Sequence, residues 1–428
     1  MNNIIISGSK KMHGTVNISG AKNAAVALLP AALLADSPSR LENVPDISDI
    51  TYMCKLLESI GVRVKIISKH VLEIDPRGLF TASLGLEFAR QMRASYYLLG
   101  AFLSKFNNAE VPMPGGCNFG VRPIDQHIKG FKSLGATCLL EDGLMKISCI
   151  KLTGSNIYLD VISVGATINI MISAVKAEGI TVIENAAKEP HVVDVANFLN
   201  SMGADIMGAG TDIIKIKGVK YLHGTTYSVI PDQIEAGTYM VAACATQSSI
   251  TIKNIIPKHL EAITAKLEEI GAHIICYDDA IKIEANNKPK GCNIKTMPYP
   301  GFPTDMQPQI VSLLAISDGT SIVNESVWDN RFRYVSELYT MGANISINDR
   351  VAVITGVKKL KGNKIKACDL RAGAALVIAG LSAEGITIIE DSDYIERGYE
   401  NISTKFSSLG ADIQLITSSE DKNISCIS

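Results

Sequence analysis

Hydrophobic and polar residues follow a pattern along this chain that recurs six times. Each copy has a helical stretch, then an apolar residue, a glycine, a small residue and a short strand. The copies are LLESIGVRV, FKSLGATC, FLNSMGADI, KLEEIGAHI, LYTMGANI and KFSSLGADI, with glycines at Gly61, Gly135, Gly203, Gly271, Gly342 and Gly410. Glycine suits the left-handed position that ends a helix. Six unrelated helix ends are the alternative, and the near-equal spacing argues against it.

A second phrase lies between these copies and predicts short strands. AEGITVIENA at 177–186 and AEGITIIEDS at 383–392 are nearly identical, and SPSRLENV, QSSITIKNI and DGTSIVNES are looser copies. β-Branched residues after a turn signal are typical of a strand. Before each copy lies an apolar helix, which we expect to be buried because it lacks a polar face. These helices are Ala21–Ala35, Ala94–Phe106, Ala166–Ala177, Ala236–Ala245, Gln307–Ile316 and Ala372–Ala383.

The pattern therefore predicts an α/β protein of six units of roughly 70 residues, each reading helix, strand, helix, strand, strand. The second helix of each unit, such as Glu261–Ile270 or Ile402–Leu409, mixes charged and apolar residues and should lie outside. Buried helices with strands around them indicate an inside-out arrangement. Six units divide into two domains of three. The strand pair Ile4–Ser7 and Thr15–Ser19 lacks a preceding helix and would complete the last unit, with both termini in one domain.

Composition narrows the class of protein. Apolar residues make up 47% of the 428 residues, enough for large cores, and the net charge of −2 lacks the basic excess that nucleic-acid or acidic-membrane partners require. The nine cysteines contain no CxxC pair and the seven histidines no HExxH pattern. No stretch resembles a signal peptide or is long enough to span a membrane. We expect a reduced, cytoplasmic protein without metal or cofactor.

Polar residues open the buried helices, and some of them lack a structural explanation. Ser163 and Asp305 suit helix caps. Lys22, Arg93 and Arg371 do not, because the helix dipole opposes a cation at a helix start by about 0.3–1 kcal/mol. Three such placements at equivalent positions indicate an anion that offsets them. Helix starts already offer free N–H groups to phosphate, so a small anionic ligand is the favoured interpretation.

The stretch PMPGGCNFGVR, residues 112–122, departs from the repeat, because proline and glycine replace the regular strand phrase. Such a stretch predicts a loop, and loops often carry function. It lacks the GK[ST] of a Walker loop. Cys117 lies in its middle, where no apolar periodicity favours burial, whereas Cys54, Cys138 and Cys244 suit buried positions. A loop cysteine near Arg122 could act as nucleophile, proton donor or redox sensor.

Several motifs together resemble a known enzyme family. They are SGAKNAA at 19–25, MRAS at 92–95, PGGCNFGVRPID at 114–125, SVGATINIM at 163–171, FPTDMQ at 302–307, DNRF at 329–332, DLRA at 369–372 and ERGYE at 396–400. Together they resemble the UDP-N-acetylglucosamine 1-carboxyvinyltransferase branch of the enolpyruvyl transferases, from end to end. The cysteine loop followed by RPID distinguishes this branch from the related shikimate-phosphate enzymes.

The resemblance implies a fold, a domain division and a reaction. The fold is a two-domain inside-out α/β barrel, with three βαβαββ repeats in each domain. One domain spans 22–230, and the other joins 1–21 to 231–428. The reaction transfers enolpyruvyl from phosphoenolpyruvate to the sugar 3-hydroxyl of UDP-N-acetylglucosamine and releases phosphate, the first committed step of peptidoglycan synthesis. Both partners are small molecules, and no oligomeric state follows.

The resemblance also implies roles for the candidate residues. Cys117 would donate a proton to C3, because a thiol with a pKa of about 8.5 is mostly protonated at neutral pH, and fosfomycin would alkylate it. Asp305 would be the base, together with Lys22 and Arg397 in the catalytic set. Phosphoenolpyruvate would contact Lys22, Asn23, Arg122 and Arg397 and, through its carboxylate, Arg331 and Arg371. The UDP-sugar would contact Arg93, Arg122, Pro123, Ile124, Asp125, Gln126, Ser163, Val164, Gly165, Asp305 and Val327.

Some alternatives remain open at this level. A cap and a base are equally good interpretations of Asp305, and Trp328 suits packing better than a sugar platform. Many relatives carry lysine two residues before Ser163, where this chain has Val161, so no lysine–diphosphate contact is expected there. A shikimate-phosphate transferase and a silent UDP-sugar sensor are the rival functions. The first conflicts with Cys117, and the second with the presence of both an acid and a base.

Overall fold

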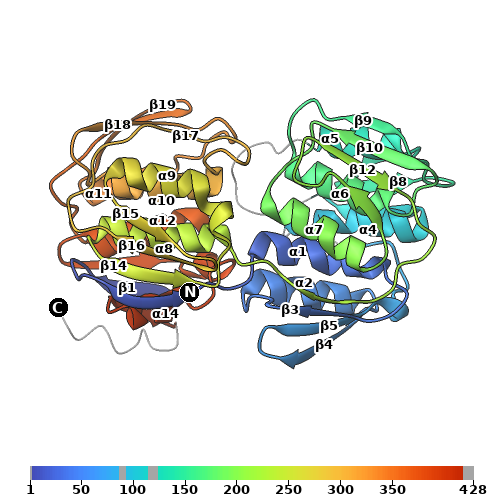
Figure 1. The fold of residues 1–428 in the computed structure, drawn as a ribbon, viewed down its shortest axis with the longest axis horizontal. Helices are drawn as coiled ribbons and strands as arrows, with labels where there is room; N and C mark the ends of the chain where they lie inside the picture. The colour runs from blue at the N-terminus through green and yellow to red at the C-terminus, as the bar shows by residue number, and fades with distance from the viewer. Residues whose placement is uncertain (1, 86–92, 114–123, 418–428) are drawn as a thin grey trace. The chain divides into compact units, whose positions relative to one another are not determined.

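The computed structural model describes residues 2–85, 93–113 and 124–417. The chain divides into two compact units, which are described separately here. One joins Met1–Ser19 to Pro231–Ser428, and the other is Gly20–Ile230 (Figure 1). Each unit has one hydrophobic core built around three buried helices. In the part of the chain that is described, no helix has both the length and the apolar character to cross a bilayer.

The repeat predicted from the sequence is present, and one copy shows its plan. β9 (Asn156–Tyr158) leads into the buried helix α6 (Val164–Ala174), and β10 (Ile180–Glu184) leads into the outer helix α7 (Pro190–Ser201). A hairpin of β11 (Asp205–Met207) and β12 (Ile213–Lys217) follows. The four strands form one sheet in the order β11-β12-β10-β9, in which β9 and β10 are parallel and the other pairs antiparallel. This is the βαβαββ plan.

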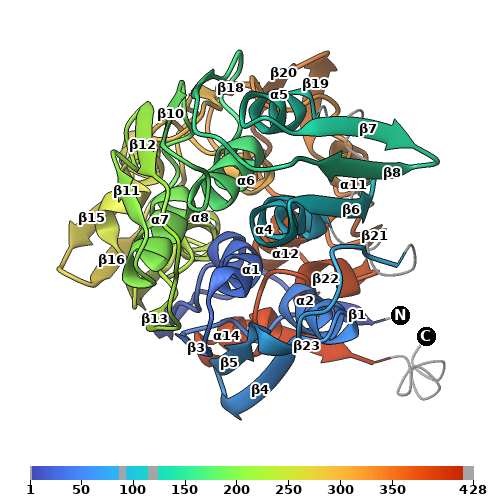
Figure 2. The ribbon, with the colours of Figure 1, turned by 90° about the vertical axis from the view of Figure 1, so that its right-hand side faces the viewer.

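The rest of the Gly20–Ile230 unit follows this plan twice more, except that one sheet has three described strands, because Ser83 forms only an isolated bridge with Glu110 in place of the first strand. Its inner helices α1, α4 and α6 lie inside three separate sheets (Figure 2). The other elements are α1 (Lys22–Ala31), β3 (Ser39–Glu42), α2 (Ser48–Ser59), β4 (Arg63–Ser68), β5 (Val71–Asp75), η3 (Arg93–Tyr96), α4 (Tyr97–Phe106), β6 (Asn108–Pro112), α5 (Asp125–Ser133), β7 (Thr137–Glu141), β8 (Leu144–Ser148) and β13 (Thr226–Ser228).

The unit of Met1–Ser19 and Pro231–Ser428 packs α8, α10 and α12 against one another within three sheets (Figure 1). Its elements are β1 (Asn3–Ser7), β2 (His13–Asn17), α8 (Gln233–Ala245), β14 (Ser249–Lys253), α9 (Glu261–Ile270), β15 (His273–Cys276), β16 (Ala280–Glu284), β17 (Ile294–Lys295), η5 (Thr304–Met306), α10 (Gln307–Leu314), β18 (Thr320–Asn324), α11 (Val335–Thr340), β19 (Asn344–Asn348), β20 (Val351–Thr355), β21 (Lys364–Lys366), α12 (Leu370–Ser382), β22 (Ile386–Glu390), α13 (Asp393–Glu396), α14 (Ile402–Ser408) and β23 (Asp412–Ile416).

The N-terminal strands complete two different sheets and do not pair with each other. β1 lies between β22 and β23 and is antiparallel to both, so it completes the last repeat as predicted. β2 instead runs parallel to β14 and supplies the first strand of the fourth repeat. The expectation of a terminal strand pair was therefore wrong. In the Gly20–Ile230 unit, β13 plays the corresponding part, because it runs parallel to β3.

The six repeated glycines adopt the predicted conformation. Gly61, Gly135, Gly203, Gly271, Gly342 and Gly410 have φ between +91° and +106°. Residues with a Cβ rarely adopt this conformation, which explains why the repeat ends its outer helices on glycine. A further glycine matters for the site: a Cβ at Gly237 of α8 would lie 3.0 Å from the Met306 side chain. Its absence lets α8 pack closely against the turn that carries Asp305.

Candidate active site

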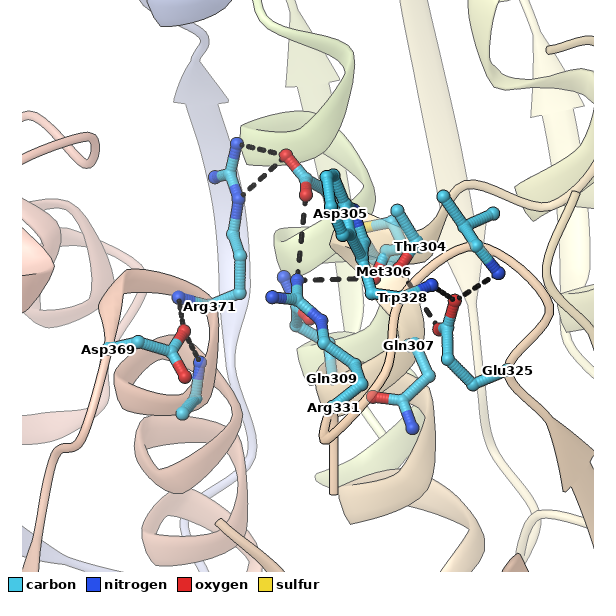
Figure 3. Close-up of polar contacts among 12 residues, drawn as sticks. Thr304, Asp305, Met306, Gln307, Gln309, Glu325, Trp328, Arg331, Asp369 and Arg371 are labelled. Atoms are coloured by element: carbon cyan, nitrogen blue, oxygen red, sulfur yellow. Dashed lines mark hydrogen bonds and ion pairs between the residues drawn. The ribbon is translucent and has the colours of Figure 1, made fainter. Parts of the chain in front are cut away.

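Asp305 is in the short helix η5, directly before α10. The residues at the cap positions of η5 and α10 are Pro303 and Met306, so the cap interpretation of Asp305 is wrong. Its carboxylate instead accepts hydrogen bonds from Arg371 Nε at 3.1 Å and Nη2 at 2.9 Å, and from Arg331 Nη2 at 3.5 Å (Figure 3). The side chain keeps 31% of its surface exposed. Asp305 is thus an accessible carboxylate held between two guanidinium groups.

Arg371 and Arg331 are both buried, each with 4% of the side chain exposed. Arg371 is in the first turn of α12, whose cap is Asp369; that carboxylate accepts from the amides of Arg371 and Ala372 at 2.9 and 3.0 Å. Burial disfavours the charge of Arg371, but the carboxylates around it, Asp305 foremost, outweigh burial and raise the pKa of the guanidinium. Charge-assisted hydrogen bonds from these two buried cations hold the partly exposed Asp305 carboxylate in place.

A buried polar cluster around Tyr399 contacts Arg371. The guanidinium carbon lies 5.5 Å from the centre of the Tyr399 ring, within the range of a cation–π contact. The Tyr399 hydroxyl lies 2.9 Å from Thr238 Oγ1 and accepts from Gln309 Nε2 at 3.1 Å. Sequence reasoning missed this cluster. The ERGYE motif could have indicated this cluster, because the motif contains Tyr399 as well as Arg397. Arg397 directly follows α13.

In the Gly20–Ile230 unit, Lys22 opens α1 and pairs with Asp49 at 2.8 Å. Both side chains are largely buried, with 14% and 8% exposed. The sequence argument required an anion at this helix start, and a carboxylate of the protein already supplies one. The same is true of Arg371, which faces Asp305. These two cations are therefore no evidence by themselves for a bound anion, although both are held near helix starts.

Some of the residues expected to contact the UDP-sugar lie at the starts of α5 and α6. Gln126 Oε1 accepts from the Asp160 amide at 2.9 Å, and its Nε2 donates to Asp125 at 2.8 Å. Ser163 caps α6 by accepting from the Ala166 amide at 3.3 Å. Gly165 leaves room for a neighbouring ring, since a Cβ there would lie 3.0 Å from His127 Nε2. The segments 124–126 and 163–165 are therefore neighbours.

A cation also lies beside Val161, the position at which the family resemblance led us to expect no lysine. Lys129 of α5 pairs with Asp160 at 2.6 Å and lies 5.8 Å from the centre of the Tyr158 ring. The hydrogen bond from Lys129, followed by that from Gln126, lowers the pKa of the Asp160 carboxyl. Tyr158 and Val161 are each 56% exposed. This arrangement puts a charge and an apolar surface next to the start of α6.

Some predicted residues lie outside the described part of the chain. Cys117, Arg122 and Pro123 belong to the segment 114–123, and the side chain of Arg93 is likewise outside it. Among the described cysteines, burial raises the pKa of Cys54 and Cys244 to about 12 and of Cys138 to about 11. Such thiols are poor nucleophiles. Within the described ranges, no cluster of histidine, cysteine and carboxylate side chains is suited to a metal ion.

The described candidates fall into two sets, one in each unit. Arg331 and Arg371 both contact Asp305, and Val327 lies in the loop that leads to Arg331. Lys22 and Asn23, with the segments 124–126 and 163–165, belong to the Gly20–Ile230 unit. The first set combines a carboxylate with two cations, which suits proton transfer beside a bound anion.

A threefold βαβαββ unit carrying such a carboxylate–arginine site is typical of enolpyruvyl transferases. The family model described as EPSP synthase (3-phosphoshikimate 1-carboxyvinyltransferase) matches residues 6–406. The fold is similar to that of the enolpyruvyl transferase NikO from Streptomyces tendae, with a TM-score of 0.87 and 25% identity over 97% of this chain and 99% of that one. The EPSP synthase of Acinetobacter baumannii shares the fold at a TM-score of 0.76 and 18% identity, over 97% and 100% of the two chains.

Relatives that match over nearly their whole length indicate which branch of the family the chain belongs to. The chain is 58% identical over 413 residues to UDP-N-acetylglucosamine 1-carboxyvinyltransferase 3 of Caldanaerobacter subterraneus subsp. tengcongensis, covering 96% of this chain and 99% of that protein. It is 56% identical over 415 residues to UDP-N-acetylglucosamine 1-carboxyvinyltransferase 2 of Clostridium acetobutylicum, covering 97% and 99%. The chain therefore belongs to the enolpyruvyl transferase family, in the branch of the UDP-N-acetylglucosamine 1-carboxyvinyltransferases.

Proposed function

We propose that this chain transfers the enolpyruvyl group of phosphoenolpyruvate to the 3-hydroxyl of UDP-N-acetylglucosamine and releases phosphate. The observation that carries this proposal is the sequence identity of the chain to two UDP-N-acetylglucosamine 1-carboxyvinyltransferases, which is 56% or more over nearly the whole chain. Asp305, held between Arg331 and Arg371, supports it, because the reaction requires a base close to a bound carboxylate. By its product, the reaction belongs to cell-wall biogenesis in the cytoplasm, and so to the maintenance of cell shape and to division.

The chemistry assigns one task to each group. Asp305 removes the proton of the sugar hydroxyl while the sugar oxygen attacks C2 of phosphoenolpyruvate. Cys117 donates a proton to C3. In the resulting tetrahedral adduct the thiolate of Cys117 takes a proton back from C3, the C2–C3 double bond forms again, and phosphate leaves with the electron pair of the C2–O bond. A positioned acid or base contributes about 10²–10⁴ in rate. Neither step requires a metal or cofactor as an electron carrier, because nothing is oxidised or reduced.

The binding roles are proposed along the same lines. Lys22, Arg122 and Arg397 hold the phosphate of phosphoenolpyruvate, Arg331 and Arg371 its carboxylate, and Asn23 reaches the reacting carbon. The UDP-sugar lies against Arg93, the segment 122–126, the segment 163–165, Asp305 and Val327. Domain limits of 22–230 and of 1–21 with 231–428 are proposed too, and the compact units that meet at Ser19–Gly20 and Ile230–Pro231 support them.

Phosphate release is the direct test of this function. Purified protein mixed with phosphoenolpyruvate and UDP-N-acetylglucosamine should release phosphate, and omission of either substrate should abolish the release. Shikimate 3-phosphate in place of the UDP-sugar should give none, which separates the two branches of the family. A protein that binds the UDP-sugar in a titration but releases no phosphate above a blank would be a sensor, and the proposed activity would be abandoned.

Cys117 provides a second test of this function. Fosfomycin, which mimics phosphoenolpyruvate, should alkylate this thiol, and mass spectrometry of the peptide that contains 114–122 should find the adduct. Cys117→Asp should retain turnover, because a carboxyl group can also donate a proton, while escaping the label because it lacks sulfur. Cys54→Ala is the matched control and should be labelled and inhibited like the wild type. An inactive Cys117→Asp protein would count against the proton-donor role.

A further inference from the structure

Glu325 is a buried carboxylate in the loop between β18 and Arg331, and no role has been assigned to it so far. Its side chain has no exposed surface. Oε1 accepts from two consecutive amides, Val327 at 2.9 Å and Trp328 at 3.0 Å (Figure 3). Oε2 accepts from the Thr304 hydroxyl at 3.0 Å. Burying a carboxylate is unfavourable unless its oxygens are hydrogen-bonded, and three donors meet that need here.

The three hydrogen-bond donors come from two segments of the proposed acceptor site. Thr304 lies in the segment of Asp305, and Val327 and Trp328 lie in the loop before Arg331. Thr304 directly precedes Asp305, and its carbonyl accepts from Arg331 Nη2 at 3.3 Å. Arg331 in turn donates to Asp305 at 3.5 Å. Thr304 is therefore held through its hydroxyl by Glu325 and through its carbonyl by Arg331. Of the other two partners, Val327 and Trp328, Val327 is the proposed contact for the UDP-sugar.

We propose that Glu325 is a positioning residue that fixes the base Asp305 relative to the loop that receives the sugar. One carboxylate ties Thr304, the neighbour of the base, to the amides of Val327 and Trp328. Misplacing a catalytic group by about 1 Å can cost 10²-fold in rate. This role rests on the proposed function, because it concerns the acceptor half of that reaction.

The identity of the residue supports a positioning role through hydrogen bonds. All three groups that face Glu325 donate to it, and a carboxylate is purely an acceptor. A glutamine can reproduce the pattern: its amide oxygen accepts from the two backbone amides, and its NH₂ group donates to the Thr304 hydroxyl, which then acts as acceptor. Alanine removes all three bonds and leaves the amides of Val327 and Trp328 without this partner. The two substitutions therefore separate hydrogen bonding from side-chain removal.

The test is steady-state kinetics of Glu325→Ala, Glu325→Gln and Thr304→Val, each first checked for folding by its melting temperature. Glu325→Ala should lower kcat about 10–100-fold and raise KM for UDP-N-acetylglucosamine more than KM for phosphoenolpyruvate, since Arg371 has its own supports. Glu325→Gln should restore most of the loss. Thr304→Val should show the same pattern to a smaller degree, and combining it with Glu325→Ala should add little further loss, because both remove one interaction.

Ser326→Ala is the matched control. Its hydroxyl donates to the Thr296 carbonyl, so the variant loses a bond of the same loop without touching Glu325. Kinetic constants of folded Glu325→Ala equal to those of Ser326→Ala would overturn the inference, as would a Glu325→Gln protein as impaired as Glu325→Ala. If Glu325→Ala does not fold, wild-type constants for Thr304→Val would overturn it. A wild-type protein that releases no phosphate would instead refute the proposed function itself.

Discussion

Asp305→Ala should lower kcat for phosphate release by about 10²–10⁴-fold, the usual contribution of a positioned base. Phosphoenolpyruvate should bind this variant at least as tightly as the wild type. The reason lies in the pairing seen here: Asp305 occupies the hydrogen-bonding groups of Arg371 that are proposed to receive the ligand carboxylate. The aspartate and the substrate therefore compete for one guanidinium, and removing the aspartate ends that competition.

Asp305→Asn separates the two effects. Its amide oxygen can still accept from Arg371 and Arg331, so the arginines keep a partner, but the amide cannot take a proton. Turnover should fall as far as in Asp305→Ala, while phosphoenolpyruvate affinity stays closer to that of the wild type. Titration of the ligand by calorimetry, beside phosphate release, measures both quantities.

Asp329→Ala is the control for loss of a nearby carboxylate. Asp329 lies two residues before Arg331, is 62% exposed and pairs with Arg350, and exposed ion pairs contribute only about 0–1 kcal/mol. Its turnover should stay close to that of the wild type. If Asp305→Ala kept wild-type turnover, another group would have to be the base. If it lost phosphoenolpyruvate affinity, the proposed competition for Arg371 would be wrong.

This competition has a consequence for the order of events. While Asp305 pairs with Arg371, one of its carboxylate oxygens is occupied by two hydrogen bonds from the arginine and is less available to a sugar hydroxyl. A ligand carboxylate that takes over Arg371 would release Asp305 toward the acceptor. Binding of phosphoenolpyruvate would then prepare the base for the second substrate, which couples two ligands through one shared arginine.

Local signals in the sequence were sufficient for the repeat. The six glycines predicted helix ends, and all six have positive φ, because a left-handed residue after a helix is a local requirement. Pairing of the terminal strands was not local: β2 joins β14, although Ser249 lies more than 200 residues after His13. A strand that lacks a neighbouring partner in sequence can complete any open sheet edge, and the pattern of Thr15–Ser19 does not say which.

Prediction of the site from the sequence was limited in the same way. Asp305 suited a cap and a base equally well, because the partner that decides between them, Arg371, lies 66 residues away. Glu325 gave no functional signal in the sequence, and Tyr399 gave only its place in the ERGYE motif, since each acts through a neighbour: Glu325 through Thr304 and Tyr399 through Arg371. Motifs identify residues that contact a ligand more readily than residues that hold those contacts in place.

A buried ion pair outside the proposed catalytic set should have the largest effect on stability. Lys405 of α14 pairs with Glu235 of α8 at 2.5 Å, with 19% and 3% of the side chains exposed. Lys405 also donates to Ser19 Oγ at 2.7 Å, and the Ser19 amide donates to Glu235 at 2.9 Å. The Ser19 carbonyl accepts from the Asp232 amide at 2.9 Å. This cluster ties Ser19, the last residue before the chain enters the Gly20–Ile230 unit, to α8, the first helix after the chain leaves that unit.

Lys405→Met should lower the free energy of unfolding of this unit by about 3–5 kcal/mol, because it leaves the buried Glu235 carboxylate without its cation. Lys405→Met with Glu235→Gln should recover most of the loss, since a neutral amide can still accept from the Ser19 amide. Lys10→Met is the control: Lys10 pairs with Asp412 at 2.9 Å on the surface, where exposed pairs contribute about 0–1 kcal/mol. Thermal unfolding of the three variants gives the comparison.

The pH dependence decides whether the charge is responsible. Burial, only partly opposed by Lys405, raises the pKa of Glu235 above its ordinary value. The folded protein therefore binds this proton more tightly than the unfolded chain, whose glutamate has a pKa of about 4.3. Loss of Lys405 raises the folded pKa further, so the deficit of Lys405→Met should be smaller at pH 5 than at pH 8. An equal deficit at both pH values would instead attribute the effect to lost packing of the lysine side chain.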